Sequence, residues 1–380
     1  MKKSNPVIIN TPKGRRKIGP GEPSFIIAEM SGNHNRNYEK AEEIVREAAK
    51  AGADAIKLQT YTADTITIDS KKPWFMEKNK ENPAEWQGTS LYELYTKGNT
   101  PWEWHKPLKA LAESLGLAFF STPFDTTAVD FLEDLGVDFY KIASYESTDH
   151  LLMKKIASTG KPIIMSLGYP TRDETDESVA FLRSLGVNNL ILLHCVTYYS
   201  DKLDPAQSYL ATMLDMAQRY EVPVGLSDNN GGIEVPVLAI ALGASVLEKH
   251  MIIAKEEGGN DSRFSLSAKN FADMVSTIRQ VEKDPESFVR GCPWLKEALG
   301  SVVYGPRSEQ ENYNMKFRRS LFVVEDIKRG ETFTSQNIRS IRPNIGLETK
   351  YFWDIIGKKA TRNIERAEPL SWDMIERIES

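Results

Sequence analysis

Two lysines and several hydroxyl groups stand where short apolar runs of this chain end. Lys57 and Gln59 close one run, Lys141 closes another, and Thr122 and Ser166 close two more. Burying two ammonium groups without anions costs several kcal/mol, so this placement indicates a site for an anionic ligand. Ammonium and hydroxyl groups together suit a phosphate or a carboxylate.

Other apolar runs also end in side chains that could bind or react. The run Phe25–Glu29 ends in a carboxylate, and a polar loop with Gly32, two Asn and a His follows at once. Further runs lead into Ser144 with Glu146, Thr197 with Tyr199, Ser227 with Asn229, and Glu248 with His250. A buried strand that ends in such a cluster directs side chains at a small polar ligand.

Each of these residues also has a plain structural interpretation. A lone lysine at a strand end is often a surface residue whose stem packs on apolar neighbours. Glu248 and His250 could form a structural ion pair with Lys249. We interpret His194 as a core histidine and Cys195 as a small buried apolar side chain rather than a nucleophile. Two lysines that share one mouth with Ser and Thr hydroxyls are harder to explain in this way.

Eight such runs predict buried parallel strands. They are Phe25–Glu29, Ala55–Gln59, Ala118–Ser121, Phe139–Ile142, Ile163–Ser166, Leu190–Cys195, Val224–Ser227 and Val246–His250. Amphipathic helices are expected between and after them, at Tyr38–Ala51, Trp102–Leu115, Thr126–Leu135, His150–Ser158, Asp176–Leu185, Ala206–Tyr220, Val235–Leu242 and Ala268–Glu282. This alternation is typical of a (β/α)8 TIM barrel, although a doubly wound sheet fits six or seven strands almost as well. In a barrel, the polar strand ends converge at one mouth.

The chain divides into three parts by pattern. We expect a barrel domain over residues 1–283, a linker rich in Pro and Gly over 284–313, and a small compact β-rich domain over 314–380. Within the barrel domain, the connection Thr60–Pro101 is unusually long. A loop of that length is usually a functional cover or a docking surface.

Composition excludes several classes of protein. The 380 residues are 41% hydrophobic and 27% charged, with a net charge of -5, which gives no reason to expect nucleic acid. No apolar run approaches the ~20 residues that span a bilayer, and the first residues lack the apolar core of a secretory signal. With only two cysteines, Cys195 and Cys292, we expect a reducing cytoplasm.

Seven motifs, in order, make the chain resemble the sialic acid synthase family. They are Ile27–Asn35, Gly52–Thr60, Ser121–Asp125, Tyr140–Ser144, Gly225–Asp228, Glu248–His250 and Asp261–Ser265. Members of that family are transferases that condense phosphoenolpyruvate with an amino sugar. The tail from Met315 resembles the antifreeze-like (SAF) domain that closes these synthases. The resemblance implies a domain-swapped homodimer, in which this domain covers the partner's barrel and Arg342 reaches the acyl group of the sugar.

Within the family, three segments look like the pseudaminic acid branch. They are Ala28–Asn35, Lys57–Thr62 and Thr100–His105. The expected reaction joins phosphoenolpyruvate to an open-chain acetamido sugar and releases phosphate. Another nonulosonate synthase of the family, of the legionaminic, neuraminic or spore-coat type, is the nearest alternative.

One departure from the family concerns its metal. The family continues the seventh strand with a histidine ligand, where this chain has Asn229. His250 is the remaining histidine of the expected pair. An Asn carbonyl oxygen suits a hard ion, so we expect a divalent metal, Mg²⁺ or Mn²⁺, on His250 and Asn229.

The resemblance implies a role for each remaining site residue. Phosphoenolpyruvate would be bound by Lys57, Thr122, Lys141, Ser144, Ser166 and Ser227. The sugar would contact Gln59, Thr197, Tyr199, Glu248, Asp261, Phe264 and Arg342. Glu29, Lys141 and Glu146 would be catalytic, with Glu29 orienting metal-bound water together with Asp261, and Glu146 acting as general acid or base.

Two functions of other classes stay open at this point. Lys141 on a barrel strand could form a Schiff base, as in lysine-dependent aldolases. The chain could also be a non-catalytic binder of sugar phosphates, since one expected metal ligand is missing.

Overall fold

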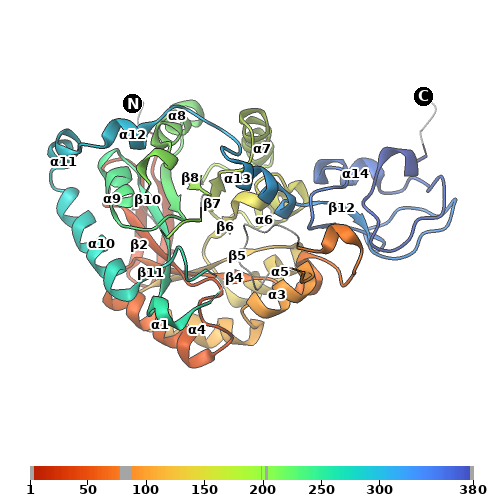
Figure 1. The fold of residues 1–380 in the computed structure, drawn as a ribbon, viewed down its shortest axis with the longest axis horizontal. Helices are drawn as coiled ribbons and strands as arrows, with labels where there is room; N and C mark the ends of the chain where they lie inside the picture. The colour runs from red at the N-terminus through yellow and green to blue at the C-terminus, as the bar shows by residue number, and fades with distance from the viewer. Residues whose placement is uncertain (1–3, 78–87, 198, 202–203, 260, 377–380) are drawn as a thin grey trace.

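The computed structural model describes residues 4–77, 88–197, 199–201, 204–259 and 261–376. Eight parallel strands form a barrel (Figure 1): β3 (Phe25–Glu29), β4 (Ala55–Thr60), β5 (Ala118–Pro123), β6 (Tyr140–Ile142), β7 (Ile163–Leu167), β8 (Leu190–Val196), β9 (Val224–Asp228) and β10 (Val246–Ile252). The last strand pairs with the first, and β5 lies next to β6. The TIM barrel is therefore confirmed, because a doubly wound sheet would not return to its first strand.

Eight helices surround the strands: α1 (Tyr38–Lys50), α4 (Trp102–Ser114), α5 (Thr126–Leu135), α6 (His150–Ala157), α7 (Arg172–Ser184), α8 (Leu210–Tyr220), α9 (Glu234–Ala241) and α10 (Ala268–Val281). Three begin away from the expected residue, and for α9 the difference is a single residue. α7 starts earlier because Thr171 and Glu174 form a capping box. α8 starts later because Tyr209 has a left-handed φ of 47°, which separates the helix from a 3-10 turn at Pro205–Gln207.

An unexpected hairpin lies at the amino-terminal end of the barrel. Its strands are β1 (Val7–Thr11) and β2 (Gly14–Ile18). Val7, Ile9 and Ile18 pack with the inward side chains of the barrel strands in one apolar cluster. This packing fills the lower part of the barrel, so polar side chains gather only at the opposite mouth.

The long connection and the expected linker both contain helices. The connection includes α2 (Ala63–Ile66), a 3-10 turn η1 (Pro73–Phe75) and α3 (Leu91–Gly98), and its residues 78–87 lie outside the described residues. The segment after residue 284 forms α11 (Pro285–Gly291), α12 (Leu295–Leu299) and α13 (Glu309–Asn314). Its apolar side chains, including the fully buried Ala298, pack on the barrel core. It is therefore part of the barrel's packing rather than an extended spacer.

The C-terminal domain, residues 314–376, lies beside the barrel (Figure 1) and has its own apolar core. It contains the antiparallel pair β12 (Ser320–Val323) and β13 (Ile338–Ile341), the helix α14 (Phe352–Ile355), and the 3-10 turns η6 (Met315–Phe317), η7 (Thr349–Tyr351) and η8 (Trp372–Met374). The short strand β11 (Leu266–Ser267) pairs with β10 and belongs to the barrel. The long connection is its docking surface, because Trp74 donates to the Ala367 carbonyl at 3.1 Å and Phe75 packs on Phe322.

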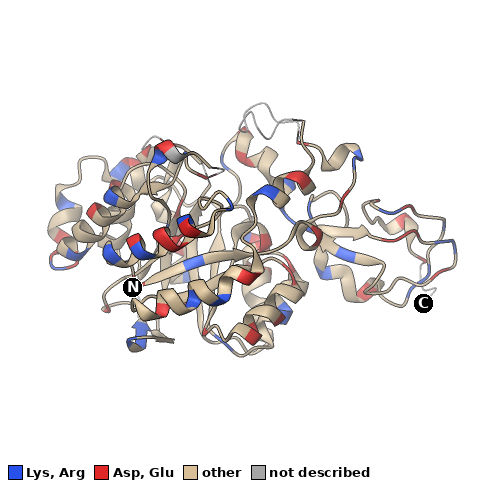
Figure 2. Cartoon of the chain, turned by 90° about the horizontal axis from the view of Figure 1, so that it is seen from below, with Lys and Arg blue, Asp and Glu red and all other residues tan. Residues whose placement is uncertain are grey.

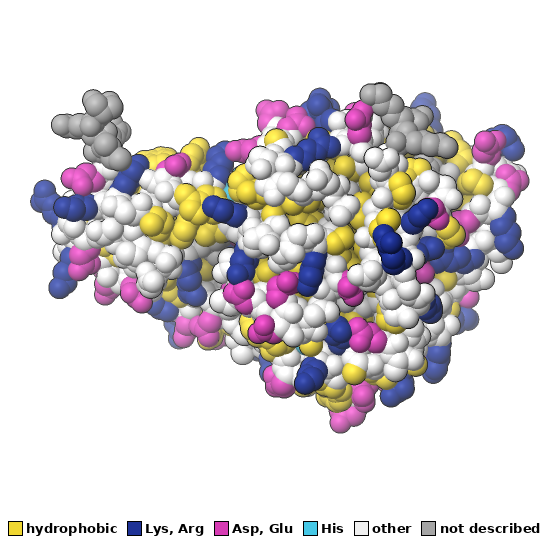
Figure 3. Space-filling view, turned by 180° about the vertical axis from the view of Figure 1, so that it is seen from behind, with side chains coloured by type: hydrophobic (Ala, Val, Ile, Leu, Met, Phe, Trp, Pro, Cys, Tyr) yellow, Lys and Arg dark blue, Asp and Glu magenta, His cyan; other side chains and the backbone are white. Residues whose placement is uncertain are grey.

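Charges of both signs alternate on the outside of the molecule. Figure 2 shows Lys and Arg interspersed with Asp and Glu along the outer helices, and Figure 3 shows the same mixture on the opposite face from Figure 1. Among the described residues, we find no helix that is both long and apolar enough to cross a membrane.

Candidate active site

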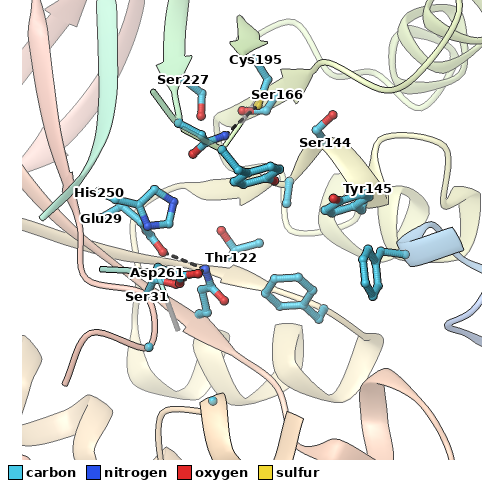
Figure 4. A pocket seen from close by; sticks show the side chains of 18 of the residues that line it. Glu29, Ser31, Thr122, Ser144, Tyr145, Ser166, Cys195, Ser227, His250 and Asp261 are labelled. Carbon is cyan, nitrogen blue, oxygen red and sulfur yellow. Dashed lines mark hydrogen bonds between the residues drawn. The ribbon is translucent and has the colours of Figure 1, made fainter. Parts of the chain in front are cut away.

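A cavity of about 280 Å³ opens at the carboxyl ends of the barrel strands (Figure 4). It brings together most of the residues expected from the sequence: Glu29, Lys57, Gln59, Thr122, Lys141, Ser144, Ser166, Tyr199, Ser227, Asn229, Glu248, His250, Asp261, Phe264 and Arg342. Its side chains come from the barrel, the long connection, α13 and the C-terminal domain. Thr197 and Glu146 are the two expected residues that do not line it.

The floor of the cavity is a buried cluster of two lysines and two glutamates. Lys57 Nζ lies 2.5 Å from Glu29 Oε2 and 3.8 Å from Glu248 Oε2. Lys141 Nζ lies 3.8 Å from Glu248 Oε1. Both lysines therefore have anionic partners within the protein, and the expectation that they lack them is wrong. The strand register pairs Glu29 with Lys57 directly, so a carboxylate meets each lysine before any ligand arrives.

The surroundings of the two lysines shift their pKa values in opposite directions. Burial alone would lower the pKa of Lys57, but Glu248 and Glu29 outweigh burial and hold this pKa above its ordinary value. Burial lowers the pKa of Lys141, and the more distant Glu248 offsets this only partly. Burial also raises the pKa of Glu29, although Lys57 opposes it. A bound anion would therefore stabilise the charged form of Lys141 more than that of Lys57.

Hydroxyl groups surround the lysines at hydrogen-bonding distance. Lys57 donates to Thr122 Oγ1 at 3.1 Å, and Lys141 donates to Ser166 Oγ at 2.6 Å. Ser144 Oγ accepts from two backbone amides, those of residues 168 and 169, so its own proton remains free to donate. Ser227 donates to Glu248 Oε1 at 3.1 Å. The floor thus presents ammonium and hydroxyl donors together, as a phosphate or carboxylate requires.

His250 and Asn229 supply uncharged nitrogen and oxygen atoms that could bind a metal ion. The Nδ1 atom of His250 is buried without a hydrogen-bond partner. Burial, together with the charges of Lys57, Lys249 and Lys141, lowers the pKa of His250 well below its usual value, so the ring is neutral. Asn229 donates its amide to the Val196 carbonyl at 2.9 Å, which leaves its own carbonyl oxygen for another partner.

The Asn229 oxygen suits a hard divalent ion and the His250 nitrogen suits a transition metal, so together they fit a divalent ion of intermediate character that takes its other ligands from water and substrate. Among the described residues, no group of three or more His, Cys, Asp and Glu side chains forms a metal cage. The alternative ion pair of Glu248 and His250 with Lys249 is wrong. Neighbouring residues of a strand point to opposite faces, and Lys249 instead pairs with Asp228 at 2.5 Å.

A second group of side chains lies beside Glu29 at the mouth. Gln59 donates to Glu29 Oε1 and to Ser31 Oγ, both at 3.0 Å, and Ser31 donates to Asp261. Burial raises the pKa of Asp261. Ser31 was not expected at the site, although it lies in the loop directly after the first strand. Figure 4 shows His250 and Glu29 on one side of the cavity and Tyr145 on the other.

The rim opposite His250 is aromatic. Arg342 lies 5.1 Å from the Tyr145 ring centroid and 5.5 Å from those of Tyr95 and Phe124, and its Nη1 donates to Tyr95 Oη at 3.0 Å. On the His250 side, Phe264 packs between Tyr199 and His250, with ring centroids 5.0 and 4.9 Å away. Tyr95 and Tyr145 are not predicted from the sequence, because no spacing links these residues to Arg342.

Two expected site residues have other partners. Glu146 is fully buried and accepts hydrogen bonds from Arg319 and Arg342, both in the C-terminal domain. The structure thus places Glu146 at the contact between the two domains. Thr197 donates to Glu311 and accepts from Arg307 at 3.2 Å, so its hydroxyl contacts the segment before the C-terminal domain.

The two interpretations made at the sixth strand are consistent with the structure. His194 Nε2 lies 2.7 Å from the Ser208 carbonyl, and burial lowers the pKa of this core histidine to about 3. Cys195 lines the cavity, but burial raises the pKa of its thiol to about 11. It is therefore protonated near neutral pH and a poor nucleophile.

Comparison with known proteins gives matches over nearly the whole chain. The NeuB family matches residues 44–289, and the SAF domain matches residues 318–376. The chain is 39% identical over 358 residues to the pseudaminic acid synthase of Helicobacter pylori, covering 94% of this chain and 99% of that protein. It is 37% identical over 346 residues to a pseudaminic acid synthase of Campylobacter jejuni, covering 91% and 95%.

A solved structure shares the whole architecture. The spore coat polysaccharide biosynthesis protein of Bacillus subtilis superposes with a TM-score of 0.80 at 30% identity, covering 96% of this chain and 98% of that one.

Proposed function

Because this chain belongs to the NeuB family, the sialic acid synthase family that its motifs resemble, we propose that it makes a nonulosonic acid of the pseudaminic type. In this reaction phosphoenolpyruvate and an open-chain acetamido sugar condense, and phosphate is released. One observation carries the proposal: all six side chains expected to bind phosphoenolpyruvate converge on one cavity with two lysines at its floor.

Phosphoenolpyruvate is placed by charge. Lys57 and Lys141 bind its phosphate and carboxylate, and the hydroxyls of Thr122, Ser144 and Ser166 donate to the remaining oxygens. The floor already holds Glu29 and Glu248, so an incoming trianion sits among mixed charges, and the lysines must turn from these carboxylates toward it. The bound anion stabilises the charge of Lys141 most, because among the described residues the only carboxylate paired with this buried lysine is Glu248, at 3.8 Å.

The bond changes follow from the two substrates. The C3 carbon of phosphoenolpyruvate attacks the sugar aldehyde, and the new carbon–carbon bond leaves a cation at C2. Water adds to C2, and phosphate leaves by cleavage of the bond between C2 and oxygen. Gln59, Asp261 and Glu29 form a linked set of acceptors and donors that orients the aldehyde and the water.

A divalent metal, Mg²⁺ or Mn²⁺, is part of the proposal. His250 Nδ1 and the Asn229 carbonyl oxygen would hold it, since both atoms are left without a protein partner of their own in the contacts described above. When bound, such an ion supplies Lewis acidity for a carbonyl oxygen. The sugar itself extends toward Phe264, Tyr199 and Arg342.

The direct test is a panel of sugars with the purified chain. Phosphoenolpyruvate is combined with 2-acetamido and 2,4-diacetamido hexoses, with Mg²⁺ or Mn²⁺ varied, and the product is detected by mass. We expect a nonulosonic acid and one equivalent of phosphate, with a 2,4-diacetamido sugar as the best substrate. Phosphate release without sugar, or no product with any sugar, would contradict the proposal, and a preference for another epimer would indicate a legionaminic or neuraminic synthase.

A Schiff-base aldolase is the second candidate, because burial lowers the pKa of Lys141 and so favours its nucleophilic amine. Borohydride treatment with substrate separates the two. A covalent adduct on Lys141 would support the aldolase, and a protein of unchanged mass that still releases phosphate supports the synthase.

The proposed assembly is a homodimer that exchanges its C-terminal domains, located in the cytoplasm. In the single chain described here, the C-terminal domain contacts its own barrel through Arg318, Arg319 and Arg342. The same contacts would form between subunits if two chains exchanged these domains. The proposal for the dimer rests on the family resemblance, and the cytoplasm on the low number of cysteines.

A further inference from the structure

One buried carboxylate joins the barrel to the C-terminal domain at the rim of the cavity. Glu146 ends the 3-10 turn η3 (Ser144–Glu146), directly after β6. Its Oε1 accepts from Arg342 Nη2 at 2.6 Å and from Arg319 Nε at 3.2 Å. The side chain is fully buried, so these two guanidinium groups supply its counter-charge in place of water.

The two arginines use their other donors differently. Arg319 donates its other hydrogen bonds to backbone carbonyls, those of Ile66 at 3.3 Å, Ser340 at 3.2 Å and Phe124. It therefore links the two domains, and its N–H groups are directed at protein atoms rather than at a ligand. Arg342 instead donates to Tyr95 Oη, leaves its buried Nε without a partner, and lines the cavity. A guanidinium has five N–H donors, so several remain for a substrate.

The position of Glu146 excludes direct proton transfer. A general acid or base must lie within hydrogen-bonding reach of the proton it moves. Glu146 does not line the cavity, and Arg342 stands between its Oε1 and the aromatic rim. Its carboxylate is also paired with two cations, Arg319 and Arg342. Glu146 does contact the Nη2 atom of Arg342, which lines the cavity.

We propose that Glu146 is a positioning residue, which orients Arg342 toward the sugar end of the cavity when the C-terminal domain docks. This inference rests on the proposed function, since it assigns Arg342 to the sugar. It predicts that loss of the Glu146 charge weakens the capture of the sugar and spares both phosphoenolpyruvate binding and the chemical step.

The test is Glu146→Gln, which keeps the shape of the side chain. We expect the KM for the sugar to rise at least tenfold (on the order of one lost charged hydrogen bond). The KM for phosphoenolpyruvate and the pH profile of kcat should stay unchanged. A fall in kcat of about 10²-fold or more with loss of one limb of the profile would overturn the inference, because a general acid or base behaves in that way.

Glu174→Gln is the matched control. Glu174 also bridges the domains, through Arg318 at 2.7 Å, but it does not contact Arg342. Glutamine keeps its capping box with Thr171. If Glu174→Gln raised the sugar KM as much as Glu146→Gln does, the effect would come from docking in general and the inference would be wrong. In an Arg342→Met background, Glu146→Gln should add nothing further to the sugar KM.

A crystal structure of Glu146→Gln gives a readout that does not depend on turnover. We expect the Arg342 guanidinium to leave the Tyr95 hydroxyl and turn away from the cavity. An unmoved Arg342 would overturn the inference even if the wild type makes product. If the wild type makes no product while Arg342 moves, the proposed function fails and the positioning role stands.

Discussion

The floor and the rim of the cavity are built in opposite ways. The floor consists of Lys57, Lys141, Glu29 and Glu248, which stand on strands of one barrel and pair with each other at 2.5–3.8 Å. The rim brings Arg342 from the C-terminal domain to Tyr95 of the long connection and to Glu146 after β6. The floor is therefore fixed when the barrel folds, whereas the rim is complete only when the domains dock.

This difference separates chemistry from recognition. In the proposed function the charges of the floor bind phosphoenolpyruvate, and their removal should affect catalysis and the stability of the barrel. In the same proposal the rim binds the sugar, so changes at the rim should affect sugar affinity and depend on how the domains assemble. Each experiment below tests whether floor and rim are separable in this way.

The largest effect is expected at the floor, from Lys141→Ala. Loss of this ammonium removes a preorganised charge from the reacting anion, and kcat should fall by about 10³-fold or more. Steady-state phosphate release measures it. Lys155→Ala, on the outer face of α6 where Lys155 pairs with Asp130, should retain near-normal turnover. A fully active Lys141→Ala protein would refute the role given to the floor.

The next effect is on stability, from Lys57→Met. This change leaves Glu29 buried without its 2.5 Å partner, which typically costs about 3–5 kcal/mol of unfolding free energy. Urea unfolding measures the loss, and adding Glu29→Gln should recover part of it. The exposed pair of Lys50 with Glu47 is the control, and Lys50→Met should cost less than about 1 kcal/mol. Equal losses at both pairs would contradict the buried cluster.

Mixing two inactive chains tests how the rim is assembled. Lys141→Ala supplies an intact C-terminal domain, and Arg342→Ala supplies an intact floor. If subunits exchange these domains, random remixing should restore about a quarter of wild-type activity, since half the dimers then contain one complete site of two. Activity is measured at low sugar concentration. No recovery would mean that each chain closes its own barrel, as in the single-chain contacts described above.

The smallest effect is a loss of folding stability at low pH, and it arises in the barrel domain. All five histidines lie between residues 34 and 250. The pKa of His194 is lowered to about 3, so the unfolded chain binds a proton there that the folded chain refuses, between pH 6.5 and about 3. The stability that this neutral histidine contributes is present above pH 6.5 and is lost as the pH falls, by at most about 1.4 kcal/mol per pH unit.

The measurement is a difference between proteins. Glu29 and Asp228 have raised pKa values and act in the opposite direction, so the wild-type slope alone is not informative. We expect the unfolding free energy of His194→Gln to fall less than that of the wild type between pH 7 and pH 5. Parallel slopes would show that His194 is not a buried neutral ring.

The sequence by itself determined the barrel and the composition of the floor. Period-two and period-3.6 patterns specify strands and helices locally, and parallel strands place their carboxyl ends at one mouth, so Lys57, Lys141, Thr122 and Ser166 could be assigned together. The hairpin under the barrel and the helices of residues 284–313 escaped this reasoning, because their short apolar patterns depend on the surface against which they pack.

Only the tertiary structure decided which charges are partners. It paired Glu29 and Glu248 with the lysines, paired Lys249 with Asp228, and placed Glu146 in contact with Arg342. Ion pairs form between atoms a few ångströms apart, and Glu146 and Arg342 are 196 residues apart in the chain. Such distances follow from domain docking and strand register, which no local pattern of residues encodes.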